Sequence, residues 1–106
     1  MTDAVWDAFV DLATALGPVV EKRSRYADKP ALVLDRREIA HAEAPGIIDL
    51  RISAAAWRTH RAAWHEDPAV SADPSRRDWI ELRVASPADV RRLQPLLEAS
   101  IRANGG

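Results

Sequence analysis

Apolar residues recur at helical spacing at three places along the chain. Near the start they lie three or four positions apart, at Val5, Phe9, Leu12 and Leu16. This spacing puts them on one face of a helix, with Thr2 as the expected N-cap and Gly17-Pro18 as the stop. A second helix is expected over residues 54–66, between a cap at Ser53 and the helix breaker Pro68.

The third helix has the clearest start signal in the chain. Ser86, Pro87 and Asp89 stand at the cap, first and third helical positions, which is a variant of the capping box. Its apolar stripe consists of Val90, Leu93, Leu97 and Ile101. Pro95 lies inside this helix, where it removes a backbone hydrogen bond and crowds the preceding turn, so we expect a kink near Arg91.

Between the helices, apolar and polar residues alternate with the period of two that is typical of strands. Residues 30–35 and 38–43 predict a hairpin, with Arg36-Arg37 as its turn. Pro45-Gly46 is a second turn signal. Residues 47–52 follow it and alternate regularly, which predicts an antiparallel strand with one buried face.

Two further segments complete the predicted sheet. Residues 78–84 alternate in the same way, and residues 69–71 are compatible with a short edge strand. Residues 19–29 carry mixed charges without alternation, and we expect a loop there with at most one short extended piece. The fold class is therefore α+β, with N- and C-terminal helices. Its antiparallel sheet has about 4–5 strands, and the helices pack on one face.

The composition indicates one domain spanning residues 1–106. Cysteine is absent, which excludes disulfides, thiolate metal sites and cysteine nucleophiles. Fifteen Lys and Arg residues balance sixteen Asp and Glu residues, and this net charge of −1 argues against nucleic acid as a partner. No apolar run approaches the about 20 residues of a membrane span. The start of the chain lacks a signal-peptide pattern, so we expect no membrane association and a cytoplasmic location.

Polar residues of the strands at 47–52 and 78–84 turn to the side opposite the core, which predicts a polar sheet face. His41 joins this face only if the hairpin register turns it outward. A one-residue slip turns it towards the core instead, and the sequence leaves both alternatives open. The candidate binding residues are His41, Asp49, Arg51, Trp79, Glu81 and Arg83.

Two interpretations of this face stay open. An aromatic ring beside acidic and basic groups can bind a small anion or an aromatic ligand, and a histidine beside a carboxylate is the minimal acid–base unit. The same residue types also form cross-strand ion pairs on a solvated face, each worth less than about 1 kcal/mol. The second interpretation describes the more frequent outcome for such patterns.

We expect no metal site and no cofactor. His60 and His65 are five positions apart, which is not one helical face, and His41 with Glu43 supplies only two ligands. No serine stands in the glycine-flanked context of a nucleophile elbow. Glycine-rich phosphate loops are absent as well.

Aromatic and arginine residues offer further candidates. Trp57 and Trp64 are expected in the core between helix and sheet, whereas alternation turns Trp79 away from it and makes Trp79 the best candidate for a functional aromatic residue. Arginines cluster in three expected turns or loops, at residues 23–25, 36–37 and 76–77. These clusters form either one anion-binding rim or three separate solvated turns.

Five short motifs stand out: Ser24-Arg25-Tyr26, Pro30-Ala31-Leu32, Arg37-Glu38-Ile39-Ala40-His41, Ile48-Asp49-Leu50-Arg51 and Asp78-Trp79-Ile80-Glu81-Leu82-Arg83. They resemble a bacterial family of small single-domain proteins labelled "luciferase domain", whose function is unknown. The resemblance covers most of the chain after Gly17. It implies the α+β fold of the YjbR and MmcQ proteins, for which structural analogy has suggested DNA binding. Two positions depart from the family pattern. Glu43 stands where a second histidine is common, and Arg36 or Arg37 replaces the hairpin glycine.

The sequence thus favours a non-enzymatic module that binds a small ligand or a protein partner through the exposed sheet face. One alternative is a small enzyme that uses His41 with Asp49 or Glu81 as an acid–base pair. Another is a nucleic-acid-binding domain that uses the arginine turns. The partner is an unknown small ligand or protein, and a homodimer is among the alternatives.

Overall fold

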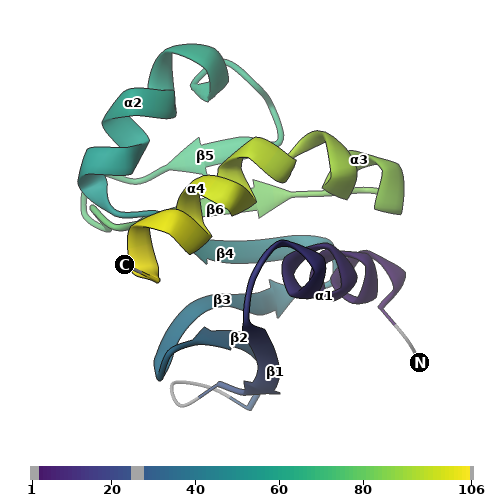
Figure 1. Ribbon diagram of the computed structural model, residues 1–106. Coiled ribbons are helices and arrows are strands. Elements are labelled where there is room, and N and C mark those ends of the chain that lie inside the picture. Colours follow the sequence, from purple (N-terminus) through teal and green to yellow (C-terminus); the bar gives the residue numbers. More distant parts are fainter. Residues whose placement is uncertain (1–2, 25–27, 106) are drawn as a thin grey trace.

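A six-stranded antiparallel sheet forms the centre of the molecule (Figure 1). The structure is a computed structural model that describes residues 3–24 and 28–105. The strands lie in the order β1-β2-β3-β4-β6-β5. In chain order, the elements are α1 (Ala4–Leu16), β1 (Val19–Arg23), β2 (Pro30–Leu34), β3 (Arg37–Ala44), β4 (Ile47–Arg51), α2 (Ala54–Trp64), β5 (Val70–Ala72), β6 (Trp79–Arg83), α3 (Pro87–Arg92) and α4 (Gln94–Asn104).

The α+β class with an antiparallel sheet is confirmed, but the expected number of strands was too low. The additional strand is β1, in the segment that we expected to be mainly loop. Of its five residues only Val19 is buried, and Val19 pairs with Leu34 at one edge of the sheet. An edge strand with one buried residue has no alternating apolar pattern to reveal it.

Two of the helices start or end differently from the prediction. Asp3 rather than Thr2 caps α1, since its carboxylate accepts hydrogen bonds from the backbone amides of Val5 and Trp6; Thr2 itself lies outside the described residues. The expected kinked C-terminal helix is two helices, α3 and α4, that meet at Leu93. Pro95 supplies no N–H for the preceding turn, which explains the break.

The middle helix is shorter than expected, since α2 ends at Trp64.

The β2–β3 turn lies one residue before its expected position, with Asp35 and Arg36 as its central residues. Both have positive φ angles, of 53° and 73°. This is the signature of the type I′ turn, which matches the twist of a hairpin and which glycine or asparagine normally occupies.

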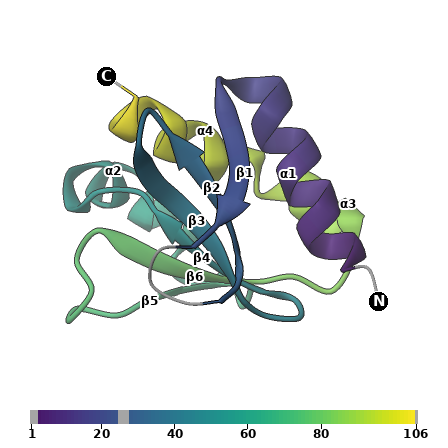
Figure 2. The ribbon, with the colours of Figure 1, turned by 90° about the horizontal axis from the view of Figure 1, so that it is seen from below.

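The hydrophobic core lies between the sheet and the helices α1, α3 and α4. These three helices contact one another, and α4 also packs on β3 and β4 (Figure 2). The largest fully buried side chains include Phe9, Leu32, Leu50, Leu82, Leu96 and Leu97. Helix α2 packs against α4 beside the sheet and buries no residue completely. Among the described residues no helix combines the length and the apolar character that a bilayer-spanning segment requires.

Candidate functional site

The strand register brings the six candidate binding residues to one face of the sheet. His41 pairs with Asp49, which settles the open register question, and Asp49 pairs with Glu81 on the far side of β4. Directly paired residues of an antiparallel sheet point to the same face. Arg51 and Trp79 form the next pair on that face, and Arg83 lies two residues beyond Glu81.

An irregularity in β3 adds an acidic group to this face. Leu32 pairs with Ala40 and Val33 with Glu38, so Ile39 is an extra residue, as in a β-bulge. Ile39 and Ala40 are both fully buried, and Glu38 therefore reaches the side of His41. Glu43 also contacts His41; it stands two positions after His41, so simple alternation already turns it to this face, and the second register shift of β3 lies between Ala42 and Ala44. A strict period of two would have put Glu38 and His41 on opposite faces.

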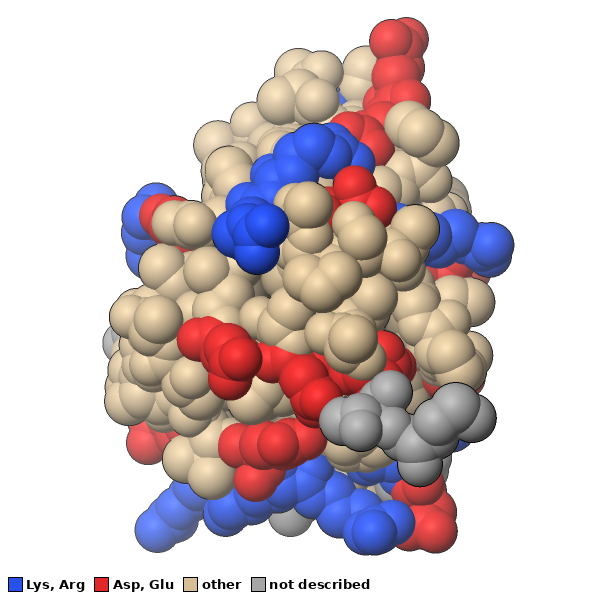
Figure 3. Space-filling view, turned by 90° about the vertical axis from the view of Figure 1, so that its right-hand side faces the viewer, with Lys and Arg blue, Asp and Glu red and all other residues tan. Residues whose placement is uncertain are grey.

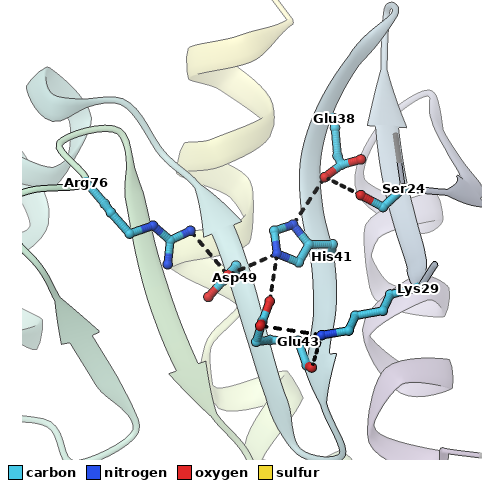
Figure 4. A network of polar contacts seen from close by, with 7 residues as sticks. All are labelled: Ser24, Lys29, Glu38, His41, Glu43, Asp49 and Arg76. Atoms are coloured by element: carbon cyan, nitrogen blue, oxygen red, sulfur yellow. Dashed lines mark hydrogen bonds and ion pairs between the residues drawn. The ribbon is translucent and has the colours of Figure 1, made fainter. Parts of the chain in front are cut away.

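His41 stands between three carboxylates (Figure 4). Its Nδ1 lies 3.1 Å from Glu38 Oε2, and its Nε2 lies 3.1 Å from Glu43 Oε2 and 3.0 Å from Asp49 Oδ2. The side chains of Glu38 and Asp49 are each 4% exposed and that of His41 is 13% exposed. Ser24 donates its hydroxyl to Glu38 Oε2 at 3.1 Å. We call His41, Glu38, Glu43 and Asp49 the histidine cluster.

Two cations border the histidine cluster. Arg76 donates to Asp49 Oδ2 at 3.2 Å, while Asp49 Oδ1 is buried and has no hydrogen-bond partner among the described residues. Lys29 Nζ lies 2.7 Å from the carbonyl of Glu43 and 3.4 Å from its Oε1. Partial burial raises the pKa of Glu43, but the charges and hydrogen bonds of Lys29 and His41 together outweigh it, and the pKa lies below its usual value.

Trp79 connects this cluster to the rest of the polar face. Its ring centroid is 5.6 Å from that of His41, and the guanidinium carbons of Arg51 and Arg76 lie 5.9 and 5.8 Å from it. Such distances are typical of cation–π contacts. Glu81 pairs instead with Arg83, at 3.0 Å. That exposed pair has the arrangement of an ordinary surface ion pair.

A cleft of about 490 Å³ adjoins Trp79, between α2 and the segment that joins β5 to β6. Four arginines line it, two from α2 and two from the loop: Arg58, Arg61, Arg76 and Arg77. Trp57 lies in its wall as well, which corrects the expectation that this residue belongs wholly to the core. Trp64, expected in the core too, is only partly buried and carries Arg92 over its ring at 5.8 Å. The sequence contained a signal for the cleft, because Trp57, Arg58, Arg61 and His65 recur along one side of a helix.

The start of α2 is held firmly at the cleft. Ser53 caps the helix by accepting the amide N–H of Ala56 at 3.1 Å, as expected. It does so with φ 72° and ψ 148°, a conformation close to a region that only glycine adopts readily and that costs about 1–3 kcal/mol. Asp78 secures this junction, since its carboxylate accepts the N–H of Ala54 at 2.9 Å and its carbonyl accepts the N–H of Ile52 at 2.7 Å.

The three arginine clusters do not form one rim, although members of two of them line the same pocket. Residues 76–77 line the cleft, whereas Arg23 and Arg36 line a smaller pocket with Lys22 and Glu38. Arg23 also pairs with Asp28, and Arg25 lies outside the described residues. On the face shown in Figure 3, basic side chains are divided into separate groups with acidic and uncharged side chains between them.

The fold and the site define the chain as an α+β protein whose sheet carries a buried histidine–carboxylate cluster beside an arginine-lined cleft. Comparison with family models, with curated proteins and with solved structures found no match. The resemblance to the "luciferase domain" proteins stays a prediction.

Proposed function

We propose that the protein is a binding module for a small organic anion, held in the cleft between α2 and the β5–β6 segment. The observation that carries this proposal is the set of four arginines around one cleft, with Asp73 as the single carboxylate in its lining. Arginine presents a planar fork of donors that fits carboxylate and phosphate groups. A net positive lining in a chain of net charge −1 is therefore a local feature that calls for an anion.

The cleft also suits a planar apolar group. Trp57 and Trp79 supply aromatic walls, and Val70 and Pro74 add aliphatic surface. A volume of about 490 Å³ lies within the range of small-molecule sites, which are mostly apolar with a few placed polar groups. The ligand class that these features favour is an aromatic or other planar molecule bearing a carboxylate or a phosphate.

The acid–base alternative has less support. His41 and Asp49 are within hydrogen-bond distance, but neither lines the cleft, and both ring nitrogens of His41 already face carboxylates. An interaction surface has less support as well, because the only large hydrophobic residue that is highly exposed among residues 3–24 and 28–105 is Val20. Protein interfaces usually present a contiguous apolar patch.

The test compares two ligands that share a ring and differ in charge. Purified protein is titrated with 1-naphthoate and with the neutral 1-naphthalenemethanol, and binding is followed by the indole N–H signals of the four tryptophans in NMR spectra. The acid should bind at least tenfold more tightly, and it should shift the signals of Trp57 and Trp79. Trp6 should not respond, because it is a buried residue of α1 that does not line the cleft, and its indole N–H donates to Glu21 at 2.7 Å.

Matched variants locate the charge effect. Arg61→Met should weaken naphthoate binding about tenfold, the equivalent of about 1.4 kcal/mol, and should leave the neutral compound unaffected. Arg102→Met removes an arginine of α4 that does not line the cleft and should change neither affinity. Equal affinity for both compounds, or equal loss in both variants, would refute an arginine-based anion site.

A further inference from the structure

We propose that His41, Glu43 and Asp49 bind a divalent transition-metal ion of the zinc type. The proposal concerns the histidine cluster and does not depend on the anion cleft. Each of the three residues offers one ligand atom, and these atoms all lie within 4.8 Å of one another. One imidazole nitrogen with two carboxylates is a ligand set typical of zinc and other first-row transition metals, whereas calcium and magnesium prefer oxygen ligands alone.

The donor spacing suits a shared ion. Metal–ligand bonds of about 2.1 Å place adjacent ligand atoms about 3.0–3.4 Å apart, depending on the coordination geometry. His41 Nε2 is 3.1 Å from Glu43 Oε2 and 3.0 Å from Asp49 Oδ2. Two of the three ligand–ligand distances therefore already have the spacing that a shared ion requires.

Glu38 completes the arrangement from behind. It lies 3.1 Å from His41 Nδ1, the nitrogen that faces away from the other two carboxylates (Figure 4). A carboxylate that accepts from Nδ1 keeps a proton on that nitrogen, so a metal would take the place of the proton on Nε2. Histidine ligands in metal sites are commonly oriented by such a carboxylate. Ser24 in turn donates to Glu38 and fixes it.

Asp49 gives a second, independent indication of a cation site. Its side chain is 4% exposed, and its Oδ1 is buried without a hydrogen-bond partner among the described residues. A buried carboxylate oxygen without a partner is costly. Its Oδ2, together with Glu43 Oε2, faces the one nitrogen atom Nε2, and a single proton there would have to serve both oxygens. A divalent ion between the three residues would take the place of that proton and contact both of these oxygens.

The charges around the histidine cluster and its exposure are also compatible with a bound divalent ion. Lys29 and Arg76 offset part of the charge of three carboxylates. Lys29 contacts Oε1 rather than Oε2 of Glu43 and can keep this contact when an ion binds, whereas Arg76 shares Asp49 Oδ2 with the ion. The Glu43 side chain is 46% exposed. Glu43 therefore provides the side from which an ion and its remaining water ligands would enter.

The test uses protein without an affinity tag, because a histidine tag would compete for the metal. Zinc binding is measured by competition with a chromophoric chelator, and cobalt is then used as a spectroscopic substitute. One zinc ion per chain is expected. Glu43→Gln, at a half-exposed side chain, should weaken binding at least tenfold, and Glu38→Gln should weaken it about 10–100-fold as a positioning residue. Circular dichroism verifies that each variant is folded.

The control is the chain's other histidine–glutamate pair, where His65 Nε2 lies 3.7 Å from Glu66 Oε1 on the surface. The double variant His65→Gln/Glu66→Gln should bind zinc as the parent does. Paramagnetic cobalt should broaden the indole NMR signal of Trp79, whose ring centroid is 5.6 Å from that of His41, before that of Trp6. In the Glu38→Gln variant, the His41 ring nitrogens should show altered chemical shifts.

Three results would overturn the proposal. They are a zinc dissociation constant weaker than about 100 μM, equal weakening in the Glu43→Gln and control variants, and cobalt broadening that spares Trp79. Because none of these measurements uses an organic anion, failure here leaves the cleft untouched, and failure of naphthoate to bind leaves the metal site untouched.

Discussion

Replacing Arg76 by methionine removes a guanidinium but keeps most of the aliphatic side chain. In the parent protein Arg76 donates to Asp49 Oδ2 at 3.2 Å, and the Asp49 side chain is 4% exposed. Asp49 would then have only His41 as a partner among the described residues. A buried carboxylate that has lost a hydrogen-bond donor is less well stabilised, so the free energy of unfolding should fall.

The magnitude follows from the exposure of both partners. A hydrogen bond to a charged group contributes about 1.5–3 kcal/mol when it is protected from water. Arg76 is 42% exposed, so solvent screens its side of the pair and the expected loss is reduced to about 1–2 kcal/mol. Its neighbour Arg77 lines the same cleft but forms no ion pair within the described part of the chain. Arg77→Met should therefore change the free energy of unfolding by less than about 0.5 kcal/mol.

Urea unfolding followed by tryptophan fluorescence measures both variants, in buffer with a chelator so that no metal enters the histidine cluster. The Arg76→Met midpoint should decrease by about 1 M relative to that of Arg77→Met. In a double-mutant cycle with Asp49→Asn, the two substitutions should be strongly non-additive. Equal midpoints for the two arginine variants, or additive effects in the cycle, would show that the Arg76–Asp49 contact does not stabilise the fold.

Three further predictions concern other parts of the molecule. Asp67 accepts two hydrogen bonds from Arg92 and one from the backbone N–H of Ala69. These hydrogen bonds lower the pKa of Asp67 below the usual 3.8. This contribution is fully present above about pH 5 and is lost as the pH falls through the lowered pKa, so Asp67→Asn should destabilise the protein by about 0.5–1 kcal/mol at pH 7 and by progressively less as the pH falls below 3.8 in urea titrations. Arg36→Gly should raise the thermal midpoint by the equivalent of about 0.5–1 kcal/mol, because Arg36 has a φ of 73°, which glycine adopts without strain. Arg37→Gly should lower the midpoint, because Arg37 lies in strand β3. Phe9→Ala should cost about 3–5 kcal/mol in urea unfolding, since its side chain is 2% exposed; a loss below 2 kcal/mol would mean that the helix is not part of the core.

The parts of the fold that follow from regular patterns were predictable from the sequence. The alternation in β4 and β6 fixed which residues face the core, and the register confirms that Asp49, Arg51, Trp79 and Glu81 share the other face. Helix starts were equally predictable where the cap residue bonds to its own helix, as Ser53 does. These signals are short-range, so one stretch of sequence contains all of the information.

The histidine cluster was only half predictable, because it depends on an interruption of the pattern. The extra residue at Ile39 reverses the face of everything before it in β3, and nothing in the local sequence marks it as a bulge. Glu38 was therefore not a candidate, although it contacts His41. Strand β1 was missed for a related reason, since an edge strand pairs through its backbone and needs few apolar side chains.

The cleft was missed because it joins two segments whose relative placement no local pattern specifies. The arginines of α2 and those at residues 76–77 were visible separately. Their meeting depends on how α2 is placed after β4, where Asp78 and the unusual backbone of Ser53 fix its start. Such tertiary placement has no signature in the periodicity of either segment.

Arg76 has a single guanidinium and serves two neighbourhoods, since it is bonded to Asp49 and also lines the cleft. A cation bound to Asp49 therefore changes how far the charge of Arg76 is available to an anion in the cleft. A cation at Asp49 would release Arg76 towards the cleft, and by thermodynamic reciprocity an anion in the cleft would favour the cation to the same degree. The cation and the anion would then bind with positive cooperativity, and this cooperativity would depend on the side chain of Arg76.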